Sequence, residues 1–266
     1  VRGGSATVHF PIWHQEIEDI LVLKNNKGTE DNRVRKLDYS IQLSEIFYKR
    51  FLSNSEITLF SPHNVPGLYE AFGTPEFDEL YERYERATSI PKTKVSARDL
   101  FTDLLKERAE TGRIYIMNID HCNTHSSFLD KVYMSNLCQE ITLPTDPIQH
   151  IDGKGEIALC ILSAVNVGII KLDEMSNLCD LAVRGLEELI DYQEYPVRAA
   201  EKSTKARRSL GIGYIGLAHF LAKNKVEYGS PESLELVHEL TESFQYHLLC
   251  SSNQLASDKG ACSEFS

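Results

Sequence analysis

Three short runs of almost uninterrupted apolar residues most constrain how this chain can fold. The runs are 56–62 (EITLFSP), 112–120 (GRIYIMNID) and 156–168 (EIALCILSAVNVG). Buried parallel strands, which are covered on both faces, have this composition, whereas half-exposed strands alternate apolar and polar residues. Patterns typical of helices separate the runs; they cover 14–24, 37–53, 76–87, 97–110, 205–224 and 232–258. The sequence therefore predicts an α/β fold with a largely parallel sheet or barrel.

Charge and cysteine content exclude several classes of protein. The 266 residues carry a net charge of −11, which argues against a surface that coats nucleic acid. Six cysteines are too sparse for a disulfide scaffold. No apolar run reaches the length of a membrane helix, and the first residues do not have the layout of a signal peptide. We therefore expect a cytoplasmic protein with reduced or redox-active cysteines.

Polar residues follow two of the predicted strands, at 61–64 (SPHN) and 118–125 (NIDHCNTH). Ligands of α/β folds collect at the carboxyl ends of strands, so these segments are candidate walls of a site. His121, Cys122 and His125 could ligate a metal, but no C-x-x-C or second histidine pair completes a set of four. We therefore predict no metal site, and expect these residues to end a strand and to contact one another or the backbone.

Gly211, Gly213 and Gly216 match the spacing G-x-G-x-x-G. A dinucleotide-binding turn requires a hydrophobic strand directly before the first glycine. The residues before Gly211 are EKSTKARRS, which do not form a buried strand. We therefore interpret the segment as a tightly packed, glycine-rich start of a helix and reject a dinucleotide site.

The stretch SNLCQE at 135–140 places Asn136, Cys138 and Glu140 at every second position. In an extended segment the three side chains would share one face, whereas in a helix Cys138 would face away from the other two. A hydrolytic cysteine needs a base such as histidine, but here a carboxylate and burial would keep the thiol neutral. A neutral thiol beside a carboxylate suits abstraction of a hydrogen atom. The alternative is a buried structural cysteine.

Longer strings around this stretch resemble the large subunit of class I ribonucleotide reductase. SNLCQEITLPT is followed by GEIALCILSAVNVG. The resemblance continues in VRGGSATVHFPIWH, LFSPHNVPGLY, ERAETGRIYIMNIDHCNTH, DLAVRGLEELIDYQEYP and ARRSLGIGYIGLAHFLAKN. The wording looks closest to the T-even-type bacteriophage versions. Asn64 departs from the family pattern, which has aspartate there, and so does CSEFS near the end.

The resemblance implies a ten-stranded α/β barrel made of two five-stranded parallel halves, with a finger loop inside. Residues 1–266 would be the central part of this barrel domain, with the finger loop near 135–145, and the upstream and downstream parts of the family are absent from the sequence. The regulatory ATP-binding region of the family would lie upstream.

The resemblance also implies roles for the residues of the loop. Cys138 would remove the 3′-hydrogen of the ribose, Glu140 would take the proton of the 3′-hydroxyl, and Asn136 would hydrogen-bond the sugar hydroxyls. Cys160 would be one of two thiols that reduce the substrate by forming a disulfide, and its partner in the family lies upstream of Val1.

At the N-terminus, Arg2, Gly3 and Gly4 match the flexible loop through which a bound effector nucleotide sets base specificity in the family. The glycines permit backbone conformations that are closed to other residues.

The implied activity is the radical-based reduction of ribonucleoside diphosphates to 2′-deoxyribonucleoside diphosphates for DNA synthesis. The resemblance implies that the chain binds no cofactor itself, that a di-iron small subunit supplies the radical, and that ATP and deoxynucleoside triphosphates act as effectors. Thioredoxin or glutaredoxin would be the reductant, and other large-subunit chains would be partners, with neither nucleic acid nor membrane involved. The competing interpretation is a non-catalytic assembly fragment that is active only with companion chains.

Overall fold

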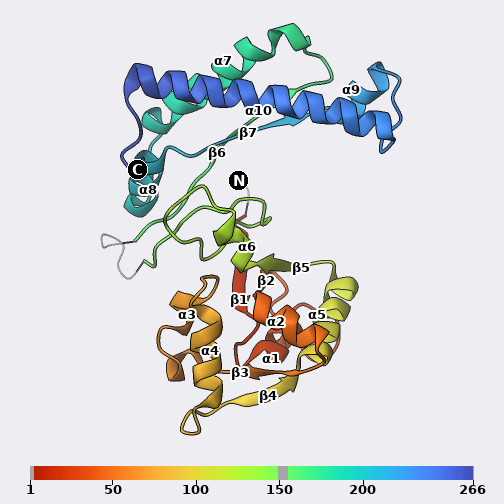
Figure 1. The fold of residues 1–266 in the computed structure, drawn as a ribbon, viewed down its shortest axis with the longest axis vertical. Coiled ribbons are helices and arrows are strands. Elements are labelled where there is room, and N and C mark those ends of the chain that lie inside the picture. The colour runs from red at the N-terminus through yellow and green to blue at the C-terminus, as the bar shows by residue number, and fades with distance from the viewer. Residues whose placement is uncertain (1–2, 149–154, 266) are drawn as a thin grey trace. The chain divides into compact units, whose positions relative to one another are not determined.

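The computed structural model describes residues 3–148 and 155–265. It divides into two compact units, Val1–Thr145 and Asp146–Ser266, whose elements are labelled in Figure 1. The first unit is built around a parallel sheet with the strand order β1-β2-β5, in which β1 is Thr7–Pro11, β2 is Asp38–Leu43 and β5 is Ile114–Asn118. His9 pairs with Ser40, and Ser40 pairs with Tyr115. This sheet confirms the predicted parallel α/β arrangement.

Helices and an antiparallel ribbon complete the first unit. The ribbon pairs β3 (Glu56–Leu59) with β4 (Thr93–Ser96). The helices are α1 (Ile17–Leu21), α2 (Glu45–Leu52), α3 (Leu68–Ala71), α4 (Phe77–Arg86), α5 (Ala97–Thr111) and α6 (Ile119–Thr124), with short 3-10 helices at Glu30–Asn32 and Pro62–Asn64.

The two faces of the three-stranded sheet differ in chemistry. One face carries Ile41 and Leu43 into a core that also buries Trp13, Phe47 and Phe60. The opposite face carries Ser40 and Gln42, which are also buried, at 0% and 1% exposure. Because buried polar groups require hydrogen-bond partners, the polar face must be covered by a segment that supplies them.

The second unit pairs two parallel strands, β6 (Ile161–Asn166) and β7 (Leu210–Ile215). Its helices are α7 (Met175–Tyr192), α8 (Arg198–Arg207), α9 (Leu217–Lys223) and α10 (Pro231–Lys259), with a 3-10 helix at Leu172–Glu174. Helix α10 runs beside α7 in Figure 1, and the core between the elements includes Cys179. The strand pair leaves Leu162 and Ile215 exposed at 62% and 56%.

Several predicted elements need correction. The pattern at 37–53 is a strand followed by a helix, because the alternation of Tyr39, Ile41 and Leu43 with polar residues has period two rather than 3.6. The segment 205–224 is also not one helix: α8 ends at Arg207, LGIGYI forms strand β7, and α9 begins at Leu217. The helix predicted over 14–24 is limited to α1.

Among the described residues the sheets have three, two and two strands and do not close into a barrel. The run at 56–62 does contain a strand, but its partner β4 is antiparallel. None of the helices within the described ranges combines the length and apolarity needed to cross a bilayer.

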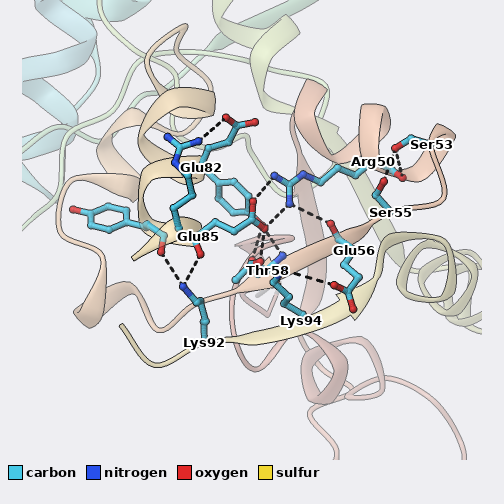
Figure 2. Close-up of polar contacts among 12 residues, drawn as sticks. Arg50, Ser53, Ser55, Glu56, Thr58, Glu82, Glu85, Lys92 and Lys94 are labelled. Carbon is cyan, nitrogen blue, oxygen red and sulfur yellow. Dashed lines mark hydrogen bonds and ion pairs between the residues drawn. The ribbon is translucent and has the colours of Figure 1, made fainter. Parts of the chain in front are cut away.

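One carboxylate ties three elements of the first unit together, as Figure 2 shows. Arg50 of α2 donates two hydrogen bonds to Glu85 of α4, the Nη2–Oε2 distance being 2.6 Å. The hydroxyl of Thr58 in β3 donates to the same carboxylate. Burial alone would raise the pKa of Glu85, but the hydrogen bonds from Arg50 and Thr58 lower it below its ordinary value. The ionised form is therefore the one that stabilises this part of the fold.

We expect Glu85→Gln to lower the free energy of unfolding by about 2–3 kcal/mol, because it leaves the largely buried guanidinium of Arg50 without its counter-charge. Urea titration followed by circular dichroism measures this loss. The matched control is Glu82→Gln on the same helix, where the carboxylate is about half exposed and contacts Arg86 at 3.4 Å. That change should cost less than about 0.5 kcal/mol. Equal losses in the two variants would contradict the proposed importance of the Arg50–Glu85 pair.

Candidate active site

The segment that covers the polar face of the sheet is the loop after α6, and it contains the stretch SNLCQE. Its start is fixed by Asn123 of α6, whose side chain accepts from the N–H of Val132 at 2.9 Å and donates to the carbonyl of Val132 at 3.1 Å. Val132 is fully buried in the core of the first unit. Lys131 donates to the carbonyl of Glu70 at the end of α3. The loop therefore leaves the core from a fixed point.

The backbone of the loop is not helical, as predicted, but it is not a regular extended strand either. The N–H of Gln139 donates to the carbonyl of Asn136 at 3.1 Å, which closes a tight turn with Leu137 and Cys138 at its centre. Gln139 has a φ of 63°, in the left-handed region. The prediction of an extended segment is therefore wrong, because a turn interrupts it.

Asn136 and Cys138 lie on this turn and Glu140 directly follows it, and the three side chains have different surroundings. The amide oxygen of Asn136 accepts from the N–H of Ile141 at 3.1 Å and from the hydroxyl of Ser135 at 3.2 Å, so it stabilises the loop itself. Cys138 and Glu140 are exposed, and no side-chain hydrogen bond joins them within the described part of the chain. The expected burial of Cys138 is therefore wrong, and its exposure also argues against a buried structural cysteine.

Side chains from alternate positions of the sheet hold the backbone of the loop. The hydroxyl of Thr7 donates to the carbonyl of Leu137 at 2.6 Å, and the amide of Gln42 donates to the carbonyl of Tyr133 at 2.6 Å. Nε2 of His9 lies 3.1 Å from the carbonyl oxygen of Ser135. These sheet residues were not predicted as part of the site. The alternation of polar and apolar residues in DYSIQL was the signal that could have identified Gln42.

The protonation of His9 depends on its position on β1, where its ring lies against the loop. Burial lowers the pKa of His9, and the hydrogen bond with the Ser135 backbone opposes this shift. Nδ1 is buried without a hydrogen-bond partner among the described residues. A second proton on the ring would therefore be placed where it has no acceptor, so the neutral form is favoured in the folded state.

We expect the stabilisation by neutral His9 to be complete above the unfolded pKa of about 6.5 and to be lost as the pH falls through the lower folded value. The reason is that the unfolded chain binds the proton first. Urea unfolding between about pH 7.5 and pH 5 should show this decline, and His9→Gln should flatten it. His14 is the control, because burial lowers its pKa as well. His14→Gln should remove only the part of the pH dependence that His14 contributes. An unchanged slope in His9→Gln would contradict this role.

Cys160 lies in the second unit, directly before β6, and is half-buried. Gly211 of β7 makes room for it: a Cβ atom at Gly211 would lie 2.7 Å from Sγ of Cys160 and 2.5 Å from Cδ2 of Leu162. The glycines at 211 and 213 are thus strand residues, not the predicted start of a helix, and a side chain at the first would displace the thiol.

We expect Gly211→Ala to displace the thiol of Cys160 and to destabilise the second unit by about 1–2 kcal/mol, because the added methyl group overlaps its neighbours. Gly213→Ala is the matched control, since no atom lies within 4 Å of its added Cβ. The control should be neutral or stabilise the strand by up to about 1 kcal/mol. Urea unfolding and the rate of Cys160 alkylation measure both effects. Identical behaviour of the two variants would contradict this packing argument.

The other predicted site segments have simpler surroundings. His121 and Cys122 lie in helix α6, immediately after β5 rather than within the strand, and His125 is the residue directly after the helix. The rings of His121 and His125 meet edge to face at 5.6 Å, and Nδ1 of His125 lies 3.2 Å from the carbonyl of His121, which confirms the expected contacts with one another and the backbone. The SPHN segment contains a 3-10 helix at Pro62–Asn64.

The predicted effector loop lies at the edge of the described chain. Arg2 is outside the described residues, so its predicted role is not tested. Gly3 and Gly4 are exposed, and a Cβ at either position would meet no atom within 4 Å.

Comparison with known proteins identifies the family. The family model described as "Ribonucleotide reductase, barrel domain" matches residues 1–266. The chain is 56% identical to the ribonucleoside-diphosphate reductase subunit alpha of Haemophilus influenzae and 52% identical to the ribonucleoside-diphosphate reductase 1 subunit alpha of Escherichia coli K12. In both cases the match covers 100% of this chain and 36% of the relative.

Subunit alpha of Enterobacteria phage T4 is also similar, at 44% identity over 100% of this chain and 36% of its own length. The two bacterial subunits named above have a higher identity to this chain than the phage subunit has. The chain spans about a third of the length of these curated relatives. With a family match over its whole length, this chain belongs to the ribonucleotide reductase barrel-domain family.

Proposed function

We propose that this chain supplies the hydrogen-abstracting cysteine and one reducing thiol of a ribonucleoside-diphosphate reductase. The observation that carries the proposal is the presentation of Cys138: an exposed thiol on a tight turn, held over a polar sheet face by Thr7 and His9. A structural cysteine has no need of an exposed position on an anchored turn. The named relatives are ribonucleoside-diphosphate reductase subunits, and this supports a role for the thiol in ribonucleotide reduction.

In the proposed reaction, Cys138 acts as a sulfur-centred radical that takes the 3′-hydrogen of the ribose and becomes S–H. Glu140 is exposed two residues further along the loop and would accept the proton of the 3′-hydroxyl. The 2′-hydroxyl would then leave as water with a proton from the reducing thiols, and after reduction the S–H of Cys138 would return its hydrogen atom to C3′, which restores the sulfur-centred radical. Asn136 would contribute to binding of the sugar hydroxyls, although its amide oxygen also holds the N–H of Ile141. The loop thus combines a hydrogen-atom acceptor with a proton acceptor.

The overall reduction requires two electrons, and Cys160 would supply one of the two thiols. Oxidation of two thiols to a disulfide releases two electrons and two protons, which balance the replacement of the 2′-hydroxyl by hydrogen and the release of water. The second thiol would come from the family's upstream cysteine, and an external dithiol such as thioredoxin or glutaredoxin would reduce the disulfide. Arg2, Gly3 and Gly4 would belong to the loop through which nucleotide effectors set base specificity.

The same proposal includes the larger assembly. Residues 1–266 would form the central part of a ten-stranded barrel of two parallel halves, with 135–145 as its finger loop. The unpaired edges of β6 and β7 among the described residues suit a sheet that continues in the rest of the protein. The radical would be supplied by a di-iron small subunit, and the reductase would be a cytoplasmic assembly with other large-subunit chains.

Reconstitution tests this function. The chain is combined with the flanking pieces of the large subunit and with the radical-generating small subunit, and deoxyribonucleotide formation from a ribonucleoside diphosphate is measured. We expect no activity from the chain alone and activity from the assembled set. If a stable complex forms but produces no deoxyribonucleotide, the chain is a non-catalytic assembly fragment, which is the competing function.

A further inference from the structure

Gln139 differs from its neighbours on the turn because its side chain faces the sheet. It is half-buried, whereas Cys138 and Glu140 on either side are exposed. Its Nε2 donates to the carbonyl of Ile116 in β5 at 2.7 Å, and its Oε1 accepts from the hydroxyl of Ser40 in β2. One side chain therefore connects the turn to two adjacent strands.

The arrangement defines the orientation of the turn. Thr7 and His9 of the sheet contact backbone groups of the loop at Leu137 and Ser135. Directly after Cys138, the side chain of Gln139 adds two hydrogen bonds to the sheet, which we call the Gln139 tie. The oxygen and the nitrogen of its amide are not interchangeable. The oxygen must face the Ser40 hydroxyl and the nitrogen must face the Ile116 carbonyl, because the opposite orientation would place two acceptors together. Only one orientation of the side chain satisfies both strands.

The backbone of Gln139 indicates that this tie matters for the turn. Its φ of 63° lies in the left-handed region, which residues with a Cβ adopt uncommonly. Glycine would adopt this conformation without steric cost. Ser40, the donor on β2, is completely buried, so loss of the Gln139 oxygen would leave its hydroxyl without this partner in the interior. Gln139 therefore has an unfavourable backbone conformation at the position from which its side-chain amide reaches both strands.

We propose that Gln139 is a positioning residue that sets the direction in which Cys138 projects from the sheet. This inference rests on the proposed function, since it assigns Gln139 a role in aligning the thiol with the 3′-hydrogen of the substrate. Reactions that depend on a near-attack geometry lose up to about 100-fold in rate for a displacement of about 1 Å. The amide therefore affects the rate of abstraction without contacting the substrate.

The test uses the assembled reductase that contains this chain and compares three variants with the native enzyme. Gln139→Glu keeps the shape of the side chain but places a carboxylate oxygen against the Ile116 carbonyl. Gln139→Leu removes both hydrogen bonds, and Ser40→Ala removes only the donor on β2. Thr142→Ser, at an exposed position just beyond the turn, is the matched control. Circular dichroism verifies that each variant is folded.

Two measurements separate positioning from folding. Hydrogen exchange reports the tie itself: we expect the amide of Gln139, which closes the turn, to exchange about tenfold faster in the Gln139 variants. Turnover with a substrate carrying deuterium at C3′ reports alignment. We expect kcat to fall by about 10- to 100-fold with KM nearly unchanged, and the isotope effect on kcat to increase because abstraction becomes slower. A smaller folded fraction would lower the rate without changing the isotope effect.

Each outcome decides the role of Gln139. Faster amide exchange together with a lower kcat and a larger isotope effect supports it. Unchanged amide exchange would show that the Gln139 tie does not hold the turn. Faster exchange with unchanged kcat and isotope effect would show that the tie does not position Cys138. If the enzyme with native Gln139 produces no deoxyribonucleotide, the proposed function fails and the positioning role fails with it. That result is distinguishable because it occurs before any substitution is made.

Discussion

Replacement of Cys138 by serine is expected to abolish deoxyribonucleotide formation in the assembled reductase while leaving the fold intact. The two side chains have the same shape, but an O–H bond is considerably stronger than an S–H bond, so the hydroxyl cannot become the hydrogen-abstracting radical. Because Cys138 is exposed on the turn, the substitution should change the free energy of unfolding by less than about 0.5 kcal/mol. The loss of activity would then be chemical rather than structural.

The matched control for this experiment is Cys250→Ser, which removes another exposed thiol, on helix α10. Turnover is measured as deoxyribonucleoside diphosphate formed with the small subunit and a dithiol reductant present. Cys250→Ser should retain the native rate. Full turnover by Cys138→Ser, or equal loss in both variants, would show that the abstracting residue has been assigned wrongly.

The long helices of the fold could be predicted closely from the sequence. The patterns at 76–87, 97–110 and 232–258 correspond to α4, α5 and α10 with boundaries that agree within one residue. Each of these segments repeats its apolar positions over several turns, so the period of 3.6 residues is well defined. The strand residues of β5 and β6 were also within the predicted runs.

The errors in the fold occur where a short strand adjoins a helix. In 37–53, the six residues of β2 contain too few positions to separate a period of two from a period of 3.6 without knowledge of the sheet. In 205–224, the glycines of LGIGYI gave no strand signal, because glycine is depleted in strands. Gly211 is explained only by the folded sheet, where Cys160 and Leu162, about 50 residues earlier, leave no room for a Cβ.

The composition of the candidate site was more predictable than its geometry. The sequence alone indicated a non-helical segment with Asn136, Cys138 and Glu140, but the turn depends on the left-handed backbone of Gln139, which no local propensity predicts for this residue. The anchors Thr7 and His9 come from a strand more than 120 residues earlier. Such pairings are set by the register of the sheet, so they require the folded chain.

Replacement of Cys160 by serine is expected to block turnover while leaving hydrogen abstraction in place. The reason is that the two cysteines have different chemical duties: Cys138 must exchange a hydrogen atom, whereas Cys160 must give up electrons as one half of a dithiol. A hydroxyl cannot form the disulfide that completes the reduction. Serine fits the half-buried position beside Gly211 because it is no larger than cysteine. The fold should therefore be retained.

Substrate labelled with tritium at C3′ separates the two steps. Hydrogen taken by Cys138 exchanges with water from the thiol, so Cys160→Ser should release tritium into solvent with deoxyribonucleotide formation at background, whereas Cys138→Ser should give neither signal. Cys262→Ser, which removes another partly buried thiol of the second unit, is the control and should give both signals at native rates. Native turnover in Cys160→Ser would show that Cys160 is not the reductant. Loss of tritium release in that variant would show instead that Cys160 is needed before reduction begins, in abstraction itself.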